Sequence, residues 1–196
     1  MLVKNKFNVG IKKSLFVLLT AFTILSGNAF AQVERAVWDK GTANNWYANI
    51  GWLRGSNYIT SSAINQLEMW QKETFDPASI DKELGYAESI GFNAMRVFLH
   101  HAAWEADKKG FKNRVNQYLT IADKHHIKTM FVFFDDCWDE NYATGREKGP
   151  RQGSNNSGMI VDPSKLYDDH PAEIASLEKY VKDVLTTVKN DKRIFL

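Results

Sequence analysis

The chain has a single cysteine, Cys137, among its 196 residues. An internal disulfide is therefore excluded, and the fold must be held together by its hydrophobic core. Beyond residue 31 the chain also lacks any apolar run close to the roughly 18 residues that a membrane-spanning helix needs. No glycine-rich turn follows the first predicted strand, which removes the main sequence support for a dinucleotide-binding sheet.

The first 31 residues have the pattern of a secretory signal peptide. An apolar run, Leu15–Leu25, is followed by the small-residue site Ala29-Phe30-Ala31, and the lysines before it are Lys4, Lys6, Lys12 and Lys13. We expect cleavage after Ala31 and a periplasmic or secreted protein of residues 32–196 with no membrane association. Losing four lysines changes the formal net charge from +2 to −2. No basic stripe then remains, so nucleic acid is not an expected partner.

Strand-like and helix-like segments alternate along the rest of the chain. Strands are predicted at 51–59, 94–99 and 127–134, with a fourth beginning at 193–196, and helices at 36–50, 77–90, 111–122 and 171–188. Asp76 and Pro77 have the residue types of a helix start, and Gly91 can supply a left-handed helix end. Such alternation predicts a parallel sheet with crossover helices.

Two long segments interrupt this alternation. Thr60–Thr74 has no clear period and is interpreted as a loop, and Glu140–His170 is rich in Gly, Asn, Ser and Asp. The second segment is too long for a plain connection, so we expect a functional excursion there.

Polar and aromatic residues follow each of the first three predicted strands. Active sites of (β/α)8 barrels are assembled from the loops at these carboxyl ends. The sequence therefore favours an α/β fold, the N-terminal portion of a (β/α)8 TIM barrel with about three and a half βα units. Arg96 stands inside the apolar second strand, which we expect to be buried on both faces. It then either reaches a ligand at the barrel mouth or neutralises a buried carboxylate.

Three stretches resemble the N-terminal part of glycoside hydrolase family 5-type barrels, which include secreted bacterial cellulase-, mannanase- and xylanase-like enzymes. They are GWLRGSNYITSSAINQLEMWQ, GFNAMRVFLHHAAWE and IADKHHIKTMFVFFDDCWD, and the resemblance covers nearly all of residues 32–196. It implies retaining hydrolysis of a β-linked polysaccharide, without metal or cofactor. It also places Arg96 beneath the cleavage site, holding the nucleophile. The predicted substrate-binding residues are Arg96, His100, His101, Asp135, Asp136, Trp138, Trp70 and Glu68.

No catalytic residue is assigned within the chain. The resemblance implies that the acid/base and nucleophile glutamates follow strands four and seven, beyond Leu196, so we expect a partial barrel that is inactive alone and a reading frame that continues. Retaining hydrolysis needs two carboxyl groups about 5–5.5 Å apart. Asp135 and Asp136 are neighbours on an emerging strand and point to opposite faces. Glu68 and Asp135 could approach each other as a carboxyl pair, but the simpler interpretation is that they bind hydroxyls or cap loops.

Two alternatives stay open. One is a carbohydrate-binding protein without catalysis, in which Trp70, Trp104 and Trp138 stack on sugar rings. The other is a metal-dependent barrel hydrolase or isomerase with ligands His100, His101, Asp135 and Asp136. Adjacent histidines on a strand diverge, which disfavours this second alternative.

Overall fold

The computed structural model describes residues 36–149, 151–153, 157–164 and 170–195. The predicted signal peptide, residues 1–31, lies outside this range. The chain divides into two units between Trp46 and Tyr47. Helix α2 (Lys40–Ile50), which confirms the predicted N-terminal helix, spans that boundary and has no buried residue. Within the described ranges, no helix combines the length and apolar character needed to cross a membrane.

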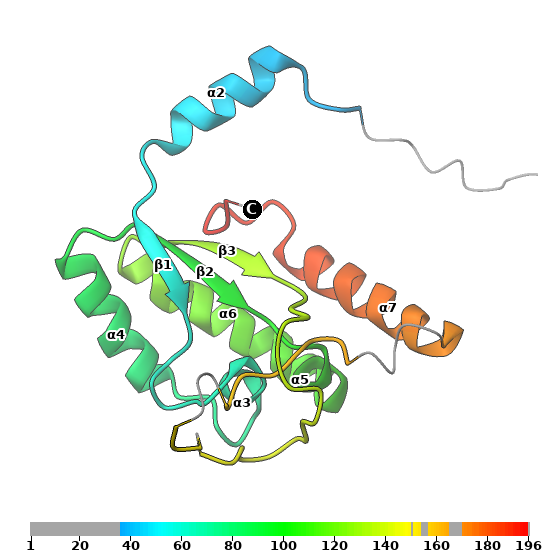
Figure 1. Ribbon diagram of the computed structural model, residues 1–196. Helices are drawn as coiled ribbons and strands as arrows, with labels where there is room; N and C mark the ends of the chain where they lie inside the picture. The colour runs from blue at the N-terminus through cyan, green and yellow to red at the C-terminus, as the bar shows by residue number, and fades with distance from the viewer. Residues whose placement is uncertain (1–35, 150, 154–156, 165–169, 196) are drawn as a thin grey trace, which may run out of the picture. The chain divides into compact units, whose positions relative to one another are not determined.

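The second unit is built on a parallel sheet in the order β1 (Gly55–Tyr58), β2 (Ala94–Phe98) and β3 (Lys128–Val132). Figure 1 shows the three strands running in the same direction. The chain returns beside β3 near its end, where Thr129 forms a parallel bridge with Ile194. These pairings confirm the predicted α/β class with parallel strands, and the bridge agrees with a fourth strand beginning at residue 193.

The helices of this unit are α3 (Gln66–Trp70), α4 (Pro77–Ser89), α5 (His101–Ala106), α6 (Lys108–Lys124) and α7 (Pro171–Val188). The predicted start of α4 is confirmed, because the Asp76 carboxylate accepts from the Ser79 amide at 3.0 Å and Pro77 is the first helical residue. Gly91 has φ +88°, the left-handed conformation expected after this helix. Helix α7 confirms the predicted helix at 171–188; its Tyr180 and Val184 are buried, while Ile174 and Leu185 are exposed.

Two short helices contradict the sequence interpretation. Helix α3 lies inside the segment predicted to be a loop, and α5 follows β2 directly where only a polar strand exit was expected. Helix α6 begins directly after α5, earlier than the predicted residue 111, and its N-cap Asp107 accepts from the Gly110 amide at 2.9 Å.

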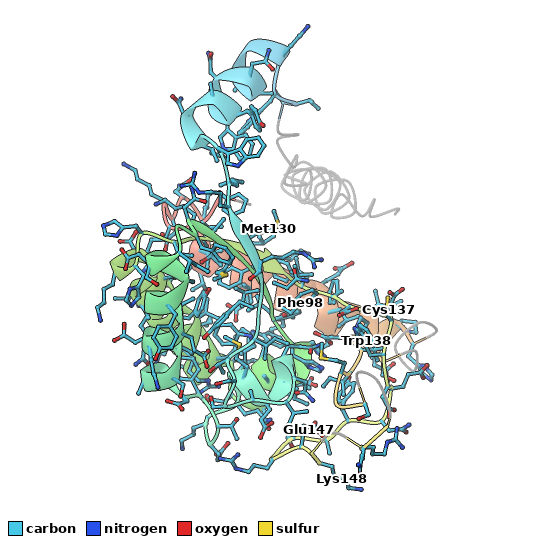
Figure 2. The ribbon with its side chains drawn as sticks, turned by 60° about the vertical axis from the view of Figure 1, so that its left-hand side comes forward. Phe98, Met130, Cys137, Trp138, Glu147 and Lys148 are labelled. Carbon is cyan, nitrogen blue, oxygen red and sulfur yellow. The ribbon has the colours of Figure 1, made fainter. Side chains whose placement is uncertain are left out.

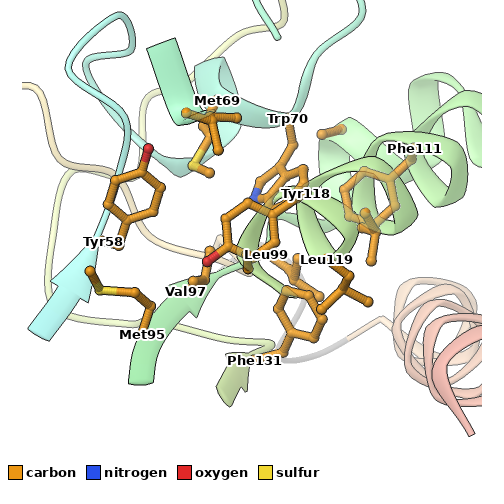
Figure 3. Packing of buried hydrophobic residues seen from close by; sticks show 14 of the residues in the cluster. Tyr58, Met69, Trp70, Met95, Val97, Leu99, Phe111, Tyr118, Leu119 and Phe131 are labelled. Atoms are coloured by element: carbon orange, nitrogen blue, oxygen red, sulfur yellow. The ribbon is translucent and has the colours of Figure 1, made fainter. Parts of the chain in front are cut away.

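Helices α4 and α6 cover one face of the sheet, and the core lies between them and the strands (Figure 1). Trp70 lies in this core, with its ring centroid 5.7 Å from Tyr118 and 5.9 Å from Phe111. Figure 3 shows side chains from α3, α6 and the strands converging around it. The labelled residues of this cluster are Tyr58, Met69, Trp70, Met95, Val97, Leu99, Phe111, Tyr118, Leu119 and Phe131.

The opposite face of the sheet is not covered by any other described element of this unit. Strand alternation turns Met95 and Val97 toward the helices, whereas Arg96 between them is exposed. Phe98 and Met130, two half-buried residues of this open face, are marked in Figure 2. The prediction that β2 is buried on both faces is therefore wrong for the described part of the chain.

Candidate functional site

The candidate site is the carboxyl-terminal part of the open sheet face. We define the open edge as Arg96 on β2 together with Asp135, Asp136 and Trp138, which follow β3. The Arg96 guanidinium donates to Asn57 Oδ1 at 3.2 Å and lies 4.4 Å from the centre of the Phe98 ring. Its partner is therefore an amide, and the alternative partner, a buried carboxylate, is not found among the described contacts of Arg96.

The other residues of the open edge are held by contacts within the segment that follows β3. Trp138 Nε1 donates to Asp135 Oδ2 at 3.0 Å, which holds an indole that is 37% exposed. The Cys137 thiol lies 3.5 Å from Asp136 Oδ1, and this hydrogen bond and the carboxylate charge raise the pKa of Cys137. Figure 2 shows Cys137 and Trp138 next to each other. The edge thus presents two carboxylates, a guanidinium and an indole face.

The acidic part of this segment has a spacing that could hold a cation. One ligand atom from each of Asp135, Asp136 and Cys137 lies within 4.8 Å of the others. Exposed carboxylates adopt such spacing without an ion, and the two histidines proposed as further ligands do not join them. The metal-centre alternative therefore loses the nitrogen ligands on which it depended.

His100 and His101 are completely buried, contrary to the prediction that they line a sugar cleft. His100 Nε2 contacts the Val161 carbonyl at 3.2 Å, and Nδ1 accepts from the Ala102 amide at 3.2 Å. Burial lowers the pKa of His100 to about 3 and also lowers the pKa of His101. The His101 ring lies beside α7, with Nε2 3.2 Å from Ser176 Oγ. The start of α5 at this point turns both rings inward.

Trp70 and Trp104 are completely buried. Trp70 Nε1 donates to the Phe98 carbonyl at 2.7 Å, and Trp104 Nε1 donates to Asp183 Oδ2 at 2.9 Å. A stacking platform needs an open ring face, and neither indole has one in this structure. Both are core residues whose indole N–H also donates a hydrogen bond to a partly buried acceptor.

Glu68 is 2% exposed and lies in the first turn of helix α3, whose N-cap is Asn65. Its Oε2 accepts from the Ile64 amide at 2.8 Å, and its own amide donates to Asn65 Oδ1 at 2.9 Å. The Asn65-x-x-Glu68 spacing is a capping pattern that could have revealed α3 from the sequence. Arg146 Nη1 lies 3.6 Å from Glu68 Oε1.

The sequence interpretation missed how the long excursion is held. We call residues Gly158–Ser164 the return segment. Asn65 Nδ2 donates to the Gly158 carbonyl at 3.0 Å, and Gln66 Nε2 donates to the Ile160 carbonyl at 2.8 Å. Gln71 binds both backbone groups of Gly145, with its Nε2 2.9 Å from the carbonyl and its Oε1 2.5 Å from the amide. Amides after β1 therefore hold the loop that follows β3.

A cavity of about 610 Å³ lies between the end of α3, the α5–α6 junction and residues 144–145. Buried Arg114 forms part of its wall, with Nε donating to the Trp70 carbonyl at 2.7 Å and Nη1 to Asp107 Oδ2 at 3.0 Å. None of the eight predicted substrate-binding residues lines this cavity. We therefore keep the open edge as the candidate site.

No protein-family model matches this chain, and no curated protein matches it. Among solved structures, the chain is similar to the exo-β-1,4-mannosidase Op5Man5 from Opitutaceae bacterium strain TAV5, with 22% sequence identity and a TM-score of 0.47. The match covers 69% of this chain and 22% of that chain. At this level of similarity, no residue role transfers from that enzyme to this protein.

Proposed function

We propose that this chain forms the glycan-binding edge of an exported glycoside hydrolase that acts on β-linked polysaccharide. The observation that carries the proposal is the exposed Arg96 on the open sheet face, followed at the next strand exit by Asp135, Asp136 and Trp138. Carboxylates and a guanidinium can hydrogen-bond sugar hydroxyls, and an indole face packs against the apolar face of a pyranose ring. Parallel α/β units bind ligands at the carboxyl ends of their strands.

The proposed reaction is retaining hydrolysis of a glycosidic bond. This reaction needs an acid/base carboxyl group and a nucleophilic carboxylate on opposite sides of the bond. The described residues supply the binding surface and the supporting Arg96, and we propose that the catalytic pair belongs to later strands of the same barrel. A positive guanidinium beside the nucleophile favours its ionised form.

Carbohydrate binding without catalysis is the second candidate function. It is favoured by Trp138, whose exposed indole is already oriented by Asp135. Measurement of glycan turnover beside glycan binding separates the two candidates, because only a hydrolase releases new reducing ends.

The first test compares two exposed tryptophans. Trp138→Ala should weaken the binding of β-linked oligosaccharides by about 1 kcal/mol, or about fivefold in Kd, because a stacking face is lost. Trp52 is 76% exposed and precedes β1. Because it lies at the amino-terminal side of the sheet, Trp52→Ala is the matched control and should bind as the parent does. Equal calorimetric affinities for both variants and the parent would contradict the proposed site.

The second test concerns Arg96 and uses the complete enzyme, so that glycan hydrolysis can be measured. Arg96→Ala should lower kcat on the order of a hundredfold, as expected for lost transition-state electrostatics. Its effect on the free energy of unfolding should stay within about 0.5 kcal/mol, because the side chain is exposed. A kcat within about threefold of the parent value would show that Arg96 does not support the nucleophile.

A further inference from the structure

The open edge is held in place by the return segment, which pairs with Asp135 through its backbone. Asp135 and Asp162 form an antiparallel bridge, with amide-to-carbonyl distances of 2.7 and 2.6 Å in the two directions. A separate, parallel bridge joins Asp139 to Ile160, where the Val161 amide donates to the Asp139 carbonyl at 3.0 Å. The return segment is therefore the backbone partner of the residues that carry Asp136 and Trp138.

Asp162 anchors the return segment from within the protein. Its side chain is 1% exposed, and its Oδ2 accepts from the His101 amide at 2.6 Å. Its Oδ1 accepts no hydrogen bond from any described residue and lies 3.9 Å from His100 Nδ1. Because His100 Nδ1 already accepts from the Ala102 amide, the ring proton lies on Nε2, which donates to the Val161 carbonyl. His100 is thus neutral and supplies no charge to compensate a carboxylate.

We propose that uncharged Asp162, together with neutral His100, positions the open edge by keeping the return segment docked. This inference rests on the proposed function for the identity of the ligand, whereas the docking itself is a property of the described residues. A buried carboxylate with one hydrogen bond and no cation is costly. Ionisation of Asp162 therefore favours release of the return segment. Release in turn removes the backbone contacts that order Asp135–Asp139.

The expected pH dependence follows from the two states of Asp162. In a released segment its pKa is the ordinary value of about 3.9, whereas burial raises the pKa of docked Asp162 to about 8. The docked state keeps a proton that the released state loses. Each pH unit between these values therefore shifts the equilibrium toward release by about tenfold, and the shift ends above about pH 8.

The other titratable groups around Asp162 act in different ranges. The pKa values of His100 and His101 are lowered by burial, so their contribution to docking is complete above about pH 6.5 and is lost as the pH falls. Tyr180 on α7 has a pKa raised by burial and by Asp162, so it stays neutral. Asp135 meets Asp162 through its backbone. Between about pH 6.5 and 8, the predicted release therefore reports Asp162 alone.

Amide hydrogen exchange tests this inference directly. After correction for intrinsic exchange, protection of the Asp135, Asp139 and Val161 amides should fall by roughly 15-fold between pH 6.5 and 8 in the parent protein. The Leu99 amide, which donates to the Val132 carbonyl at 2.8 Å, should keep its protection and serves as the internal reference. An unchanged protection of the first three amides in the parent protein overturns the inference, whatever any variant does.

Asp162→Asn keeps the shape of the side chain but cannot ionise, so its protection should be the same at both pH values. Asp123→Asn makes the same change on the surface of α6, where the carboxylate is 56% exposed, and should retain the parental pH dependence. Equal pH dependence in Asp162→Asn and the parent would refute the assignment. Oligosaccharide affinity of the parent should fall over the same pH range. If no glycan binds while the exchange results hold, the proposed function fails and the positioning role of Asp162 stands.

Discussion

The α5–α6 junction provides a sharp stability prediction, because a glycine there makes room for a shared carboxylate. Asp107 Oδ1 accepts from the Gly110 amide at 2.9 Å, and Oδ2 accepts from Arg114 Nη1 at 3.0 Å. Arg114 also holds the end of α3 through the Trp70 carbonyl. A Cβ added at Gly110 would overlap Asp107 Oδ2 and lie 2.7 Å from Arg114 Nη1. Gly110→Ala should therefore displace the Asp107 carboxylate.

The expected cost follows from the interactions that this displacement removes. Loss of the helix cap costs about 1 kcal/mol. Loss of the charged hydrogen bond to Arg114 costs about 1.5 kcal/mol, the low end of its range because Asp107 is 38% exposed. Because Gly110 lies in the first turn of α6, alanine there regains at most about 1 kcal/mol over glycine, the helix-interior value. The net destabilisation of Gly110→Ala is about 1.5 kcal/mol, which should lower Tm by roughly 3–6 °C.

Chemical and thermal unfolding of a double-mutant cycle tests this reasoning. In an Asp107→Ala background the carboxylate is already absent, so Gly110→Ala should no longer destabilise and should raise the free energy of unfolding by up to about 1 kcal/mol. The coupling between the two positions is then about 2.5 kcal/mol. A Gly110→Ala protein as stable as the parent, or equal effects of Gly110→Ala in both backgrounds, would refute it.

Two further predictions concern polar contacts of helices. His125 binds Glu88 at 2.9 Å and Asp81 at 2.7 Å; burial opposes its charge, but these hydrogen bonds raise its pKa. Its contribution to stability should be complete below about pH 6.5 and lost as the pH rises through the higher folded value, so the Tm difference between the parent and His125→Gln should shrink in alkaline buffer. Trp104→Phe removes the donor to Asp183 and should cost about 1.5–3 kcal/mol in urea unfolding. A Trp104→Phe midpoint equal to that of the parent would mean that this hydrogen bond contributes nothing to folding.

Local chemistry in the sequence was sufficient to place several elements. Asp76-Pro77 starts α4 and Gly91 ends it because capping and left-handed backbone are properties of single residues and their immediate neighbours. Strand β3 lies inside the predicted 127–134 because a run of β-branched and aromatic residues favours a half-buried strand over a helix. The parallel order of the strands followed from the alternation of strands and helices.

Only the tertiary structure decided which side of each element is buried. Arg96 was expected within a strand buried on both faces, and it is exposed. Trp70 was expected to bind a ligand, and it is buried. Strand alternation, with a period of two, determines that Arg96 and Val97 face opposite sides of the sheet. Segments far away in the chain determine which of these sides packs against helices. The sequence pattern places Trp70 in a loop, whereas it is the last residue of helix α3.

The polar residues of the strand exits illustrate the same limit. His100 and Gln66 have the residue types of a ligand site, and the structure uses them to satisfy the backbone of the return segment, 61 and 94 residues away in the sequence. A buried carbonyl needs a donor whether or not a ligand is present. The sequence by itself determined that these strand ends are polar, and only the tertiary structure decided which polar groups are consumed inside the protein and which, such as the Asp136 carboxylate, remain exposed.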